Sequence, residues 1–425
     1  MRAAHILRKY VPAEWGGTET ALQGLTAGLA RHGVDSVIFH PLAGRIRSDP
    51  LADAGCQMRP FRAHLPILGL AEAERQRQLA IGGNLVSFDL PFKLAREPEL
   101  DVINSHVLGR LGGIALTTAR RRKIPFVVTI HGGVYAIPEP LKQQLNGRPR
   151  RGSFEWGQVF GWWWRSRHVL DEADAIITPN IREAELLRQR YPEQLIVVQP
   201  HGVNTDIYRT DHRETARQAF PSVRDRDVLL CVARVDPVKN QIWLVEQLPA
   251  ILARRPNTLL VLAGSCTNAE FGTNLQRTIS RLGLGDRVLL TGGLPPGDAR
   301  LSGLMQLARA AILPSINETF GLVILEAWAA GLPMMANRSA GSVELLREGE
   351  NGCLFDVARP ADFHAQLDRV LGEPGFRQHL IATGREWAGR YDTVAMAGQV
   401  KQLYVRLSEE KKCTTSFYAM TTPAR

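Results

Sequence analysis

The chain has 425 residues, of which 44% are hydrophobic and 22% charged, and its formal net charge is +10. This length exceeds what one hydrophobic core usually organises and predicts two domains. Because no run of about 18 uncharged apolar residues occurs, we expect no transmembrane helix. The charged N-terminus also lacks the apolar core of a signal peptide. Five scattered cysteines without C-x-x-C spacing disfavour disulfides and zinc, and predict a cytoplasmic protein.

The basic balance favours an anionic partner, which is a phosphorylated small molecule, an anionic lipid surface or a nucleic acid. A merely soluble surface explains the same charge. Nucleic-acid binding is disfavoured because the sequence has no helix-turn-helix, aromatic β-platform or finger spacing.

Short β-type runs alternate with helical stretches in the first half of the chain. A first run, AAHILRKYV, precedes the helical stretch TETALQGLTAGLARHG, where Thr18 is a candidate N-cap and Gly33 a candidate stop. The other strand candidates are SVIFH (36–40), DVINS (101–105), PFVVTI (125–130), AIITP (175–179) and LIVVQP (195–200).

The second half repeats this alternation after a polar join at 201–215. NQIWLVEQLPAILARR and the stretch after Glu318 are helix candidates. Its strand candidates are DVLLCVAR (227–234), TLLVLAG (258–264), RVLLTG (287–292) and AAILPS (310–315). The alternation predicts two Rossmann-like, doubly wound α/β domains that face a central cleft. Ligands of such sheets bind outside the carboxyl ends of the strands.

Three features are candidate binding elements, two in the first half of the chain and one in the first loop of the second half. Gly16-Gly17 follows a β-type run and opens a helix, where N–H groups bind anions, although an ordinary turn explains the pair equally. His106 and His131 each follow a strand, which suits a site at that sheet edge and a structural hydrogen-bonding role equally. In VARVDPVKNQ, a cation after a strand and another before a helix suit a diphosphate; these are Arg234 and Lys239.

The stretch NETFGLVILEAWAAG (317–331) carries two glutamates eight residues apart. With a helix expected to begin near Phe320, Glu318 lies near its N-terminus, where capping would explain a carboxylate. Glu326 lies inside the apolar run, so we expect it to be partly buried and to need polar partners. Hydroxyl groups of a sugar or a ribose would be such partners.

In this order, HGVN, ARVDPVKN, NETFGLVILEAWAAGLP and AGSVELLREGENGCLF resemble the C-terminal half of glycosyltransferase family 4, and WGGTE, DVINSH and TIHGG resemble its N-terminal half. The family comprises retaining GT-B enzymes that use nucleotide-activated sugars. The resemblance therefore implies a hexosyltransferase with a UDP-hexose or GDP-mannose type donor. It further implies a glycan or lipid-linked acceptor in cell-surface polysaccharide or lipopolysaccharide biosynthesis.

The resemblance also implies a role for each matching residue. Glu326 would bind the ribose and Glu318 the transferred sugar. The catalytic residues implied are His131, Glu318, Arg234 and Lys239; the donor-binding residues are Gly16, Gly17, Arg234, Lys239, Glu318, Phe320, Gly321, Leu322 and Glu326; the acceptor-binding residues are His106 and His131. Cations and a helix N-terminus would stabilise the departing diphosphate. Because no D-x-D stands in a suitable loop, we predict that no metal cofactor is required.

Departures from the family pattern occur at three places. Ala233 precedes Arg234 where many relatives have glycine, Ala340-Gly341 replaces a Gly-Gly pair, and Asn240 follows Lys239 where glycine is usual. The second departure bears on the pocket near the diphosphate.

The resemblance predicts an acceptor-binding domain over 1–205, with insertions near 60–100 and 138–168, and a donor-binding domain over 206–385. A helix over 386–405 is expected to cross back to the first domain, and 406–425 to be a flexible tail. The second insertion is rich in arginine and tryptophan, which suits an anionic membrane interface. Its proposed membrane contacts are Trp162, Trp163, Trp164, Arg150, Arg151 and Arg165. A buried helix start explains the tryptophans equally well.

Three other functions compete. Two carboxylates serve as acid and base in many glycoside hydrolases. This alternative is disfavoured, because the resemblance places Glu326 on the nucleotide side of the site and not at the reacting bond. A nucleotide-sugar epimerase would share the two-domain architecture without the full set of motifs. A nucleotide-sugar binding module that has lost transferase activity would keep the fold alone.

Overall fold

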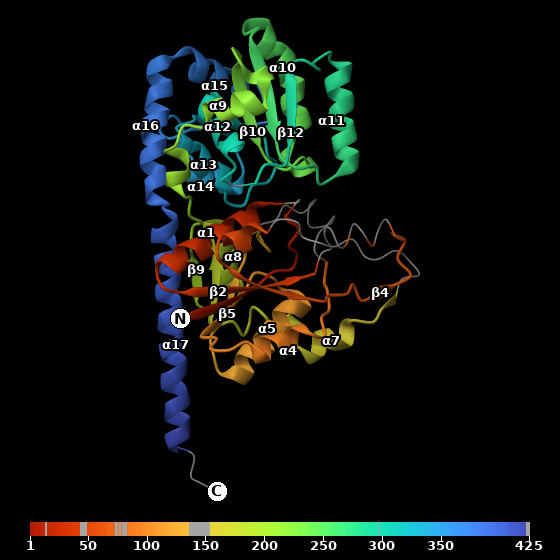
Figure 1. Cartoon of the computed structure of the whole chain (residues 1–425), viewed down its shortest axis with the longest axis vertical. Coiled ribbons are helices and arrows are strands. Elements are labelled where there is room, and N and C mark those ends of the chain that lie inside the picture. Colours follow the sequence, from red (N-terminus) through yellow and green to blue (C-terminus); the bar gives the residue numbers. More distant parts are fainter. Residues whose placement is uncertain are drawn as a thin grey trace. The chain divides into compact units, whose positions relative to one another are not determined.

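The computed structural model describes residues 1–12, 15–42, 49–72, 75, 78, 83–135, 154–295 and 297–421, with side chains as far as residue 413. The chain forms two compact units (Figure 1). The N-terminal unit comprises residues 1–12, 25–200 and 394–425, and the C-terminal unit comprises residues 13–24 and 201–393. The chain thus changes unit at Pro200, five residues before the boundary expected from the sequence.

The described part of the N-terminal unit contains a parallel sheet of order β3-β2-β1-β5-β6-β8-β9. Its strands are β1 Arg2–Ile6, β2 Asp35–Pro41, β3 Gln57–Phe61, β5 Val102–Ser105, β6 Phe126–Thr129, β8 Ala175–Thr178 and β9 Ile196–Val198. The order reverses between β1 and β5, where Ile6 pairs with Ser105. Every strand expected from the sequence forms, and β3 is an additional one.

Helices follow most of these strands. They are α1 Gly17–Arg31, α2 Pro50–Asp53, α4 Leu90–Arg96, α5 Gly109–Arg122, α7 Gln158–Trp163, η2 Ser166–His168 and α8 Ile181–Arg190. The expectation for Thr18 is wrong, because α1 already begins at Gly17. Gly33 does end the helix: it adopts a φ of 72°, which only glycine adopts without strain, and its N–H donates to the carbonyl of Ala30 at 3.0 Å.

The described part of the C-terminal unit contains a second parallel sheet, of order β12-β11-β10-β13-β14-β15. Its strands are β10 Asp227–Val232, β11 Thr258–Ala263, β12 Val288–Gly292, β13 Ala310–Leu313, β14 Met334–Asn337 and β15 Cys353–Phe355, the last two not expected from the sequence. The order reverses between β10 and β13.

Helices cover both faces of this sheet (Figure 1). They are η3 Thr205–Tyr208, α9 Arg213–Ala219, η4 Pro221–Val223, η5 Pro237–Lys239, α10 Gln241–Arg254, α11 Ala269–Arg281, α12 Ala299–Leu307, α13 Leu322–Ala330, α14 Ala340–Leu345, α15 Pro360–Gly372 and α16 Pro374–Arg390. The separate apolar clusters on the two faces explain why the strands read as continuous hydrophobic runs.

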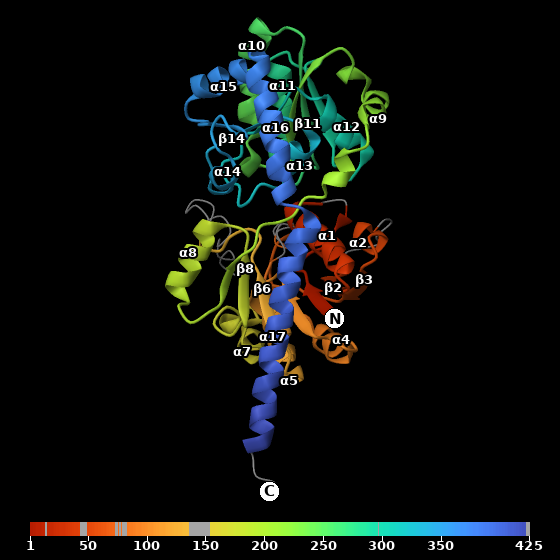
Figure 2. The ribbon, with the colours of Figure 1, turned by 90° about the vertical axis from the view of Figure 1, so that its left-hand side faces the viewer.

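The last helix, α17 Thr393–Thr421, belongs to the N-terminal unit from Val394 onward. Figure 2 shows it running along the N-terminal sheet. The buried side chains of Ala397, Val400, Tyr404 and Leu407 pack on one face of that sheet. The expectation of a tail from residue 406 is therefore wrong, because the apolar spacing of the packed face continues to Leu407 and the backbone stays helical to Thr421.

The described parts of the two irregular insertions meet each other. A short sheet pairs β4 Ile67–Leu68 with β7 Phe154–Glu155. The buried guanidinium of Arg110, on α5, holds both segments: it donates to the carbonyl of Asn84, to the carbonyl of Gly157 at 2.8 Å and to the carboxylate of Glu155. Two segments that are unrelated in sequence thus form one surface.

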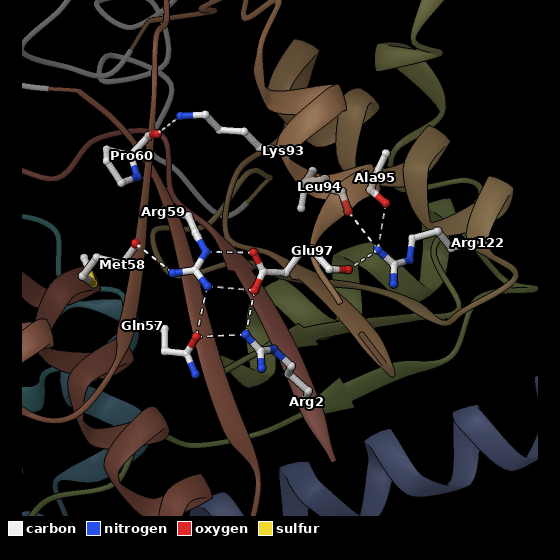
Figure 3. A network of polar contacts seen from close by, with 10 residues as sticks. All are labelled: Arg2, Gln57, Met58, Arg59, Pro60, Lys93, Leu94, Ala95, Glu97 and Arg122. Atoms are coloured by element: carbon white, nitrogen blue, oxygen red, sulfur yellow. Dashed lines mark hydrogen bonds and ion pairs between the residues drawn. The ribbon is translucent and has the colours of Figure 1, made fainter. Parts of the chain in front are cut away.

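A second ion-pair network fastens α4 to the sheet (Figure 3). The buried carboxylate of Glu97 accepts from Arg2 at 2.6 Å and from Arg59 at 2.8 Å, and its backbone carbonyl accepts from Arg122 at 2.6 Å. Since a buried carboxylate needs such partners, this network explains how a charged residue ends α4 inside the unit.

Candidate functional site

The C-terminal unit brings its candidate residues together at the point where the strand order reverses. β10 and β13 are neighbours and pair Leu230 with Ala311. The loop after β10 carries Arg234 and Lys239, and the loop after β13 carries Glu318. Open α/β sheets bind ligands at such a switch point, so the topology places these charges where a ligand is expected.

Lys239 and Glu318 form an ion pair, with Nζ 2.6 Å from Oε2 and both side chains less than one-fifth exposed. Arg234 is 46% exposed and lies 3.4 Å from a carboxylate oxygen of Asp236. Asp236 also accepts from the N–H groups of Val238 and Lys239 at the start of η5. Arg234 is therefore the more accessible of the two cations, whereas Lys239 is largely covered and paired with Glu318.

Two of the family departures have a structural explanation. Asn240 adopts a φ of 57°, and Asn tolerates this left-handed conformation better than other non-glycine residues. Its side chain also donates to the carbonyl of Pro314 at 3.3 Å. Ala233 has no positive φ, so alanine fits there, and the close approach falls on Gly264: a Cβ there would lie 2.0 Å from the Ala233 oxygen.

The N-terminus of α13 lies beside the ion pair. The helix begins at Leu322, two residues later than expected, because Gly321 precedes it with a φ of 94°. In the part of the chain that the structure describes, no acceptor faces the N–H groups of Phe320, Gly321 and Leu322. Free N–H groups at a helix N-terminus bind anions.

The remaining departure, Ala340-Gly341, is explained by Gly341. Its N–H donates to the Glu318 carbonyl at 2.7 Å, and a Cβ at this position would lie 2.6 Å from the Phe320 nitrogen. The close approach of two backbones thus requires glycine at 341, whereas Ala340 begins α14 in ordinary helical conformation.

Glu326 is half-buried on α13, as expected, and burial raises the pKa of its carboxyl to about 7. Its charge in turn adds to the burial that raises the pKa of Tyr208 on η3. Within the described ranges no protein group hydrogen-bonds to this carboxylate. A carboxylate in that situation is suited to a ligand that brings hydroxyl groups.

Gly17 is the first residue of α1, and Gly16 precedes it. The Gly16 N–H donates to the carboxylate of Glu19 at 3.1 Å, so it serves the helix N-terminus of its own chain. A Cβ on Gly17 would meet nothing within 4 Å, which leaves open space around it.

In the N-terminal unit, three histidines form a row across neighbouring strands. His5 is on β1, His106 follows β5 and His131 follows β6. His5 Nδ1 lies 3.0 Å from His106 Nε2, and His106 Nδ1 lies 2.7 Å from His131 Nε2. The sequence indicated His106 and His131. His5 was missed, although a histidine inside an apolar strand is a signal in itself.

The row is held in a low-dielectric setting. Burial, and then the charge of His131, lower the pKa of His5 to about 3. Burial, and then the cation of Arg8, lower the pKa of His131 to about 4. Both rings are therefore neutral at pH 7.

The loop after His131 is fixed by a carboxylate that the sequence did not single out. Glu183, fully buried at the start of α8, accepts from the N–H of Val134 at 2.8 Å and from that of Tyr135 at 3.0 Å. It thereby positions the backbone that carries His131.

The insertions present aromatic side chains on their surface. Trp162 is 79% exposed and Trp163 65% exposed, whereas Trp164 is half-buried against the core. Arg165 is ion-paired with Glu172. The proposed contacts Arg150 and Arg151 lie outside the described residues. The alternative that the tryptophans begin a buried helix is wrong, because α7 ends at Trp163 with no buried residue and Trp164 is its half-buried C-cap.

The described residues contain no group of three or more His, Cys, Asp or Glu positioned to hold a metal ion. The histidine row is linear and does not converge on one point. Across the same residues, no helix is both long enough and apolar enough to span a bilayer.

Comparisons with known proteins identify the chain as a glycosyltransferase with the GT-B fold. The family described as "Glycosyl transferases group 1" matches residues 212–387, and that described as "Glycosyl transferase 4-like domain" matches residues 16–202. The D-inositol 3-phosphate glycosyltransferase of Actinosynnema mirum is 30% identical over 414 residues, covering 92% of this chain and 93% of the relative. That of a Nocardioides species is 28% identical over 413 residues, covering 93% and 86%.

Solved structures show the same fold. HepE of Anabaena, crystallised with UDP and glucose, has a TM-score of 0.71 at 18% identity, and 96% of this chain and 100% of that one are covered. WaaG, a glycosyltransferase involved in lipopolysaccharide biosynthesis, has a TM-score of 0.64 at 17% identity, with 95% and 99% covered. The chain belongs to glycosyltransferase family 4, and it is a transferase enzyme.

Proposed function

We propose that the protein is a retaining hexosyltransferase that takes a sugar from a nucleotide-sugar donor without a metal ion. The observation that carries the proposal is the group formed by Arg234, Lys239 and Glu318 beside the N-terminus of α13. Cations and N–H groups at one point suit the diphosphate of such a donor. Relatives support the choice, since HepE was crystallised with UDP-glucose.

Each residue has a proposed role. Glu326, which lacks a protein partner within the described ranges, binds the ribose hydroxyls. Glu318 binds hydroxyls of the sugar, which compete for its contact with Lys239. Arg234, Lys239 and the N–H groups of Phe320, Gly321 and Leu322 stabilise the charge that develops on the departing diphosphate. Each such preorganised donor is typically worth about 3–4 kcal/mol of transition-state stabilisation.

The acceptor side is proposed to involve His131, with Gly16 and Gly17 contributing N–H groups to the diphosphate. For Gly16, this role requires Glu19 to release its N–H. On this proposal the acceptor hydroxyl is deprotonated with the help of the leaving phosphate, on the same face of the sugar, so that the anomeric configuration is retained.

Two acceptor classes are supported by different observations. The exposed tryptophans favour a glycan or lipid-linked acceptor in cell-surface polysaccharide or lipopolysaccharide biosynthesis. The names of the relatives favour a phosphorylated cyclitol, as in D-inositol 3-phosphate. The donor is proposed to be of the UDP-hexose or GDP-mannose type in either case.

The test is nucleotide release from a panel of UDP-, GDP- and ADP-sugars, with inositol 3-phosphate or a lipid-linked glycan as acceptor. We expect one donor to be turned over in the presence of EDTA, and Glu326→Ala to abolish turnover. NMR of the product would give the anomeric configuration. Loss of activity in EDTA would contradict metal independence, and no turnover or nucleotide-induced thermal shift with any donor would contradict the function.

We further propose that the surface of the insertions docks on an anionic membrane at the cytoplasmic face. Trp162 and Trp163 are exposed, and so are Phe154, Val159 and Arg167 of the same insertion. Indole rings and cations together suit the headgroup region. Flotation with anionic vesicles at low salt should recover the protein, and Trp162→Ser with Trp163→Ser should reduce recovery, whereas Leu290→Ser, an exposed apolar residue of the C-terminal unit, should not. Absence of flotation would contradict docking.

A further inference from the structure

The number of N–H protons limits how the three histidines of the row can hydrogen-bond to one another. Each of its two N···N contacts, at 3.0 and 2.7 Å, needs one proton between the rings. A neutral imidazole carries one proton, on either Nδ1 or Nε2. Three neutral rings therefore have three protons, two of which lie in the contacts, and the third is at one end of the row.

Only two neutral arrangements satisfy both contacts. In one, His131 donates through Nε2, His106 donates through Nε2 to His5, and His5 Nε2 carries the terminal proton. In the other, every bond is reversed, and the terminal proton is on Nδ1 of His131. The tautomer of His131 is thus coupled to that of His5, although His106 lies between the two rings.

The surroundings of the two ends differ. At the His5 end, Ser36 Oγ lies 3.5 Å from Nε2, and its oxygen can accept a hydrogen bond from an Nε2–H. At the His131 end, the cation of Arg8 is the charged group that acts most on the ring. A positive charge disfavours an N–H at its own end of the row and favours the terminal proton at the opposite end.

We propose that His5 and His106 are positioning residues that hold His131 as its Nε2–H tautomer, so that Nδ1 of His131 presents a lone pair. This inference deepens the proposed function, and rests on it for the role of His131 beside the acceptor. A lone pair on Nδ1 accepts a hydrogen bond from a substrate hydroxyl, whereas an N–H would donate one instead. The row therefore decides which kind of substrate group His131 orients.

The tautomer is measured without any substrate. In full-length protein labelled with 15N-histidine, with peaks assigned by single His→Gln variants, we expect a pyrrole-like Nε2 and a pyridine-like Nδ1 at His131. In His5→Phe, which removes the end of the row, the His131 signals should move toward averaged values.

A matched control is available in the same sheet. His40 is buried on β2 and contacts the carbonyl of Pro41 at 3.1 Å, outside the row. His40→Phe should leave the His131 signals unchanged. A protonated Nδ1 on His131 in the parent protein, a His106 protonated on both nitrogens, or unchanged His131 signals in folded His5→Phe would overturn the proposal.

Turnover provides the second readout. On the donor found for the parent enzyme, His5→Phe should lower kcat about tenfold and leave KM for the donor unchanged, because only the orientation of the acceptor group is affected. The NMR result decides the row even if no donor is found, and turnover decides the proposed function even if the row fails.

Discussion

The ammonium of Lys239 lies 2.6 Å from the carboxylate of Glu318, although 79 residues separate them in sequence. The two arrive there because β10 and β13 are neighbours at the reversal of the strand order. Lys239→Met should lower kcat/KM by roughly 10²-fold, since it removes a cation from the proposed diphosphate site and leaves Glu318 without its partner.

Steady-state kinetics at saturating acceptor would measure this. Arg300→Met is the control, because Arg300 forms a comparable ion pair, with Asp298, in the same unit. A Lys239→Met enzyme with the activity of the Arg300→Met enzyme would exclude Lys239 from the site.

Glu326 predicts a pH dependence of stability. Its pKa is about 7 in the folded chain against 4.5 for the ordinary side chain. The neutral form is therefore favoured by folding: this contribution to stability is complete below pH 4.5 and is lost as the pH rises through 7. Glu326→Gln should then be more stable than the parent at pH 8, by at most about 3 kcal/mol, with little difference at pH 4.5.

Urea unfolding of both proteins at the two pH values would measure this difference. The parent and variant share every other titrating group, so the buried histidines cancel in the comparison. An equal difference at pH 4.5 and pH 8 would show that Glu326 keeps an ordinary pKa.

We predict that any side chain at position 341 disturbs the proposed donor site by a steric clash. In Gly341→Ala the new Cβ would lie 2.6 Å from the Phe320 nitrogen, so the backbone of the proposed diphosphate site must shift. We expect nucleotide affinity to fall about tenfold or more, as measured by isothermal titration calorimetry. Gly375→Ala is the matched control, because a Cβ there meets nothing within 4 Å. Unchanged affinity in Gly341→Ala would mean that these N–H groups do not bind the nucleotide.

We predict that Glu183 stabilises the loop that follows His131. In Glu183→Ala, the N–H groups of Val134 and Tyr135 lose their acceptor, which should lower the free energy of unfolding by about 1–3 kcal/mol. We also expect a lower kcat, because the displaced loop carries His131. Glu185→Ala, on the same helix but half-exposed, should change neither quantity. Chemical denaturation together with kinetics would show whether the two losses occur together.

We predict that the left-handed backbone conformation of Asn240 makes the stability of the protein sensitive to substitution there. Both Asn240→Ala and Asn240→Gly lose the side-chain hydrogen bond to Pro314, but only alanine is strained at a φ of 57°, so Asn240→Ala should be less stable than Asn240→Gly by about 1–2 kcal/mol. Denaturation midpoints would measure both, and equal stability of the two variants would contradict a conformational origin.

The secondary structure and candidate site residues could be predicted from the sequence wherever a single local pattern determines the structure. Continuous apolar runs such as 258–264 identify buried parallel strands, and the glutamates of 317–331 identify the α13 region. Short strands such as β15 Cys353–Phe355 escaped, because three residues carry no periodicity. Roles that depend on partners distant in sequence were also not predicted. The residues around Glu183 do not indicate its burial, and those around His5 do not indicate its contact with His106, which is 101 residues away.

The continuation of α17 to Thr421 has a consequence for how the protein is made. The N-terminal sheet is synthesised before the C-terminal unit, yet one of its faces is covered by side chains such as Val400 and Tyr404, which follow that unit in the chain. Residues 201–393 can complete their own sheet while that face still lacks its cover. A nascent chain therefore exposes this apolar face while residues 201–393 are being synthesised, and a chaperone would bind it most readily in that period.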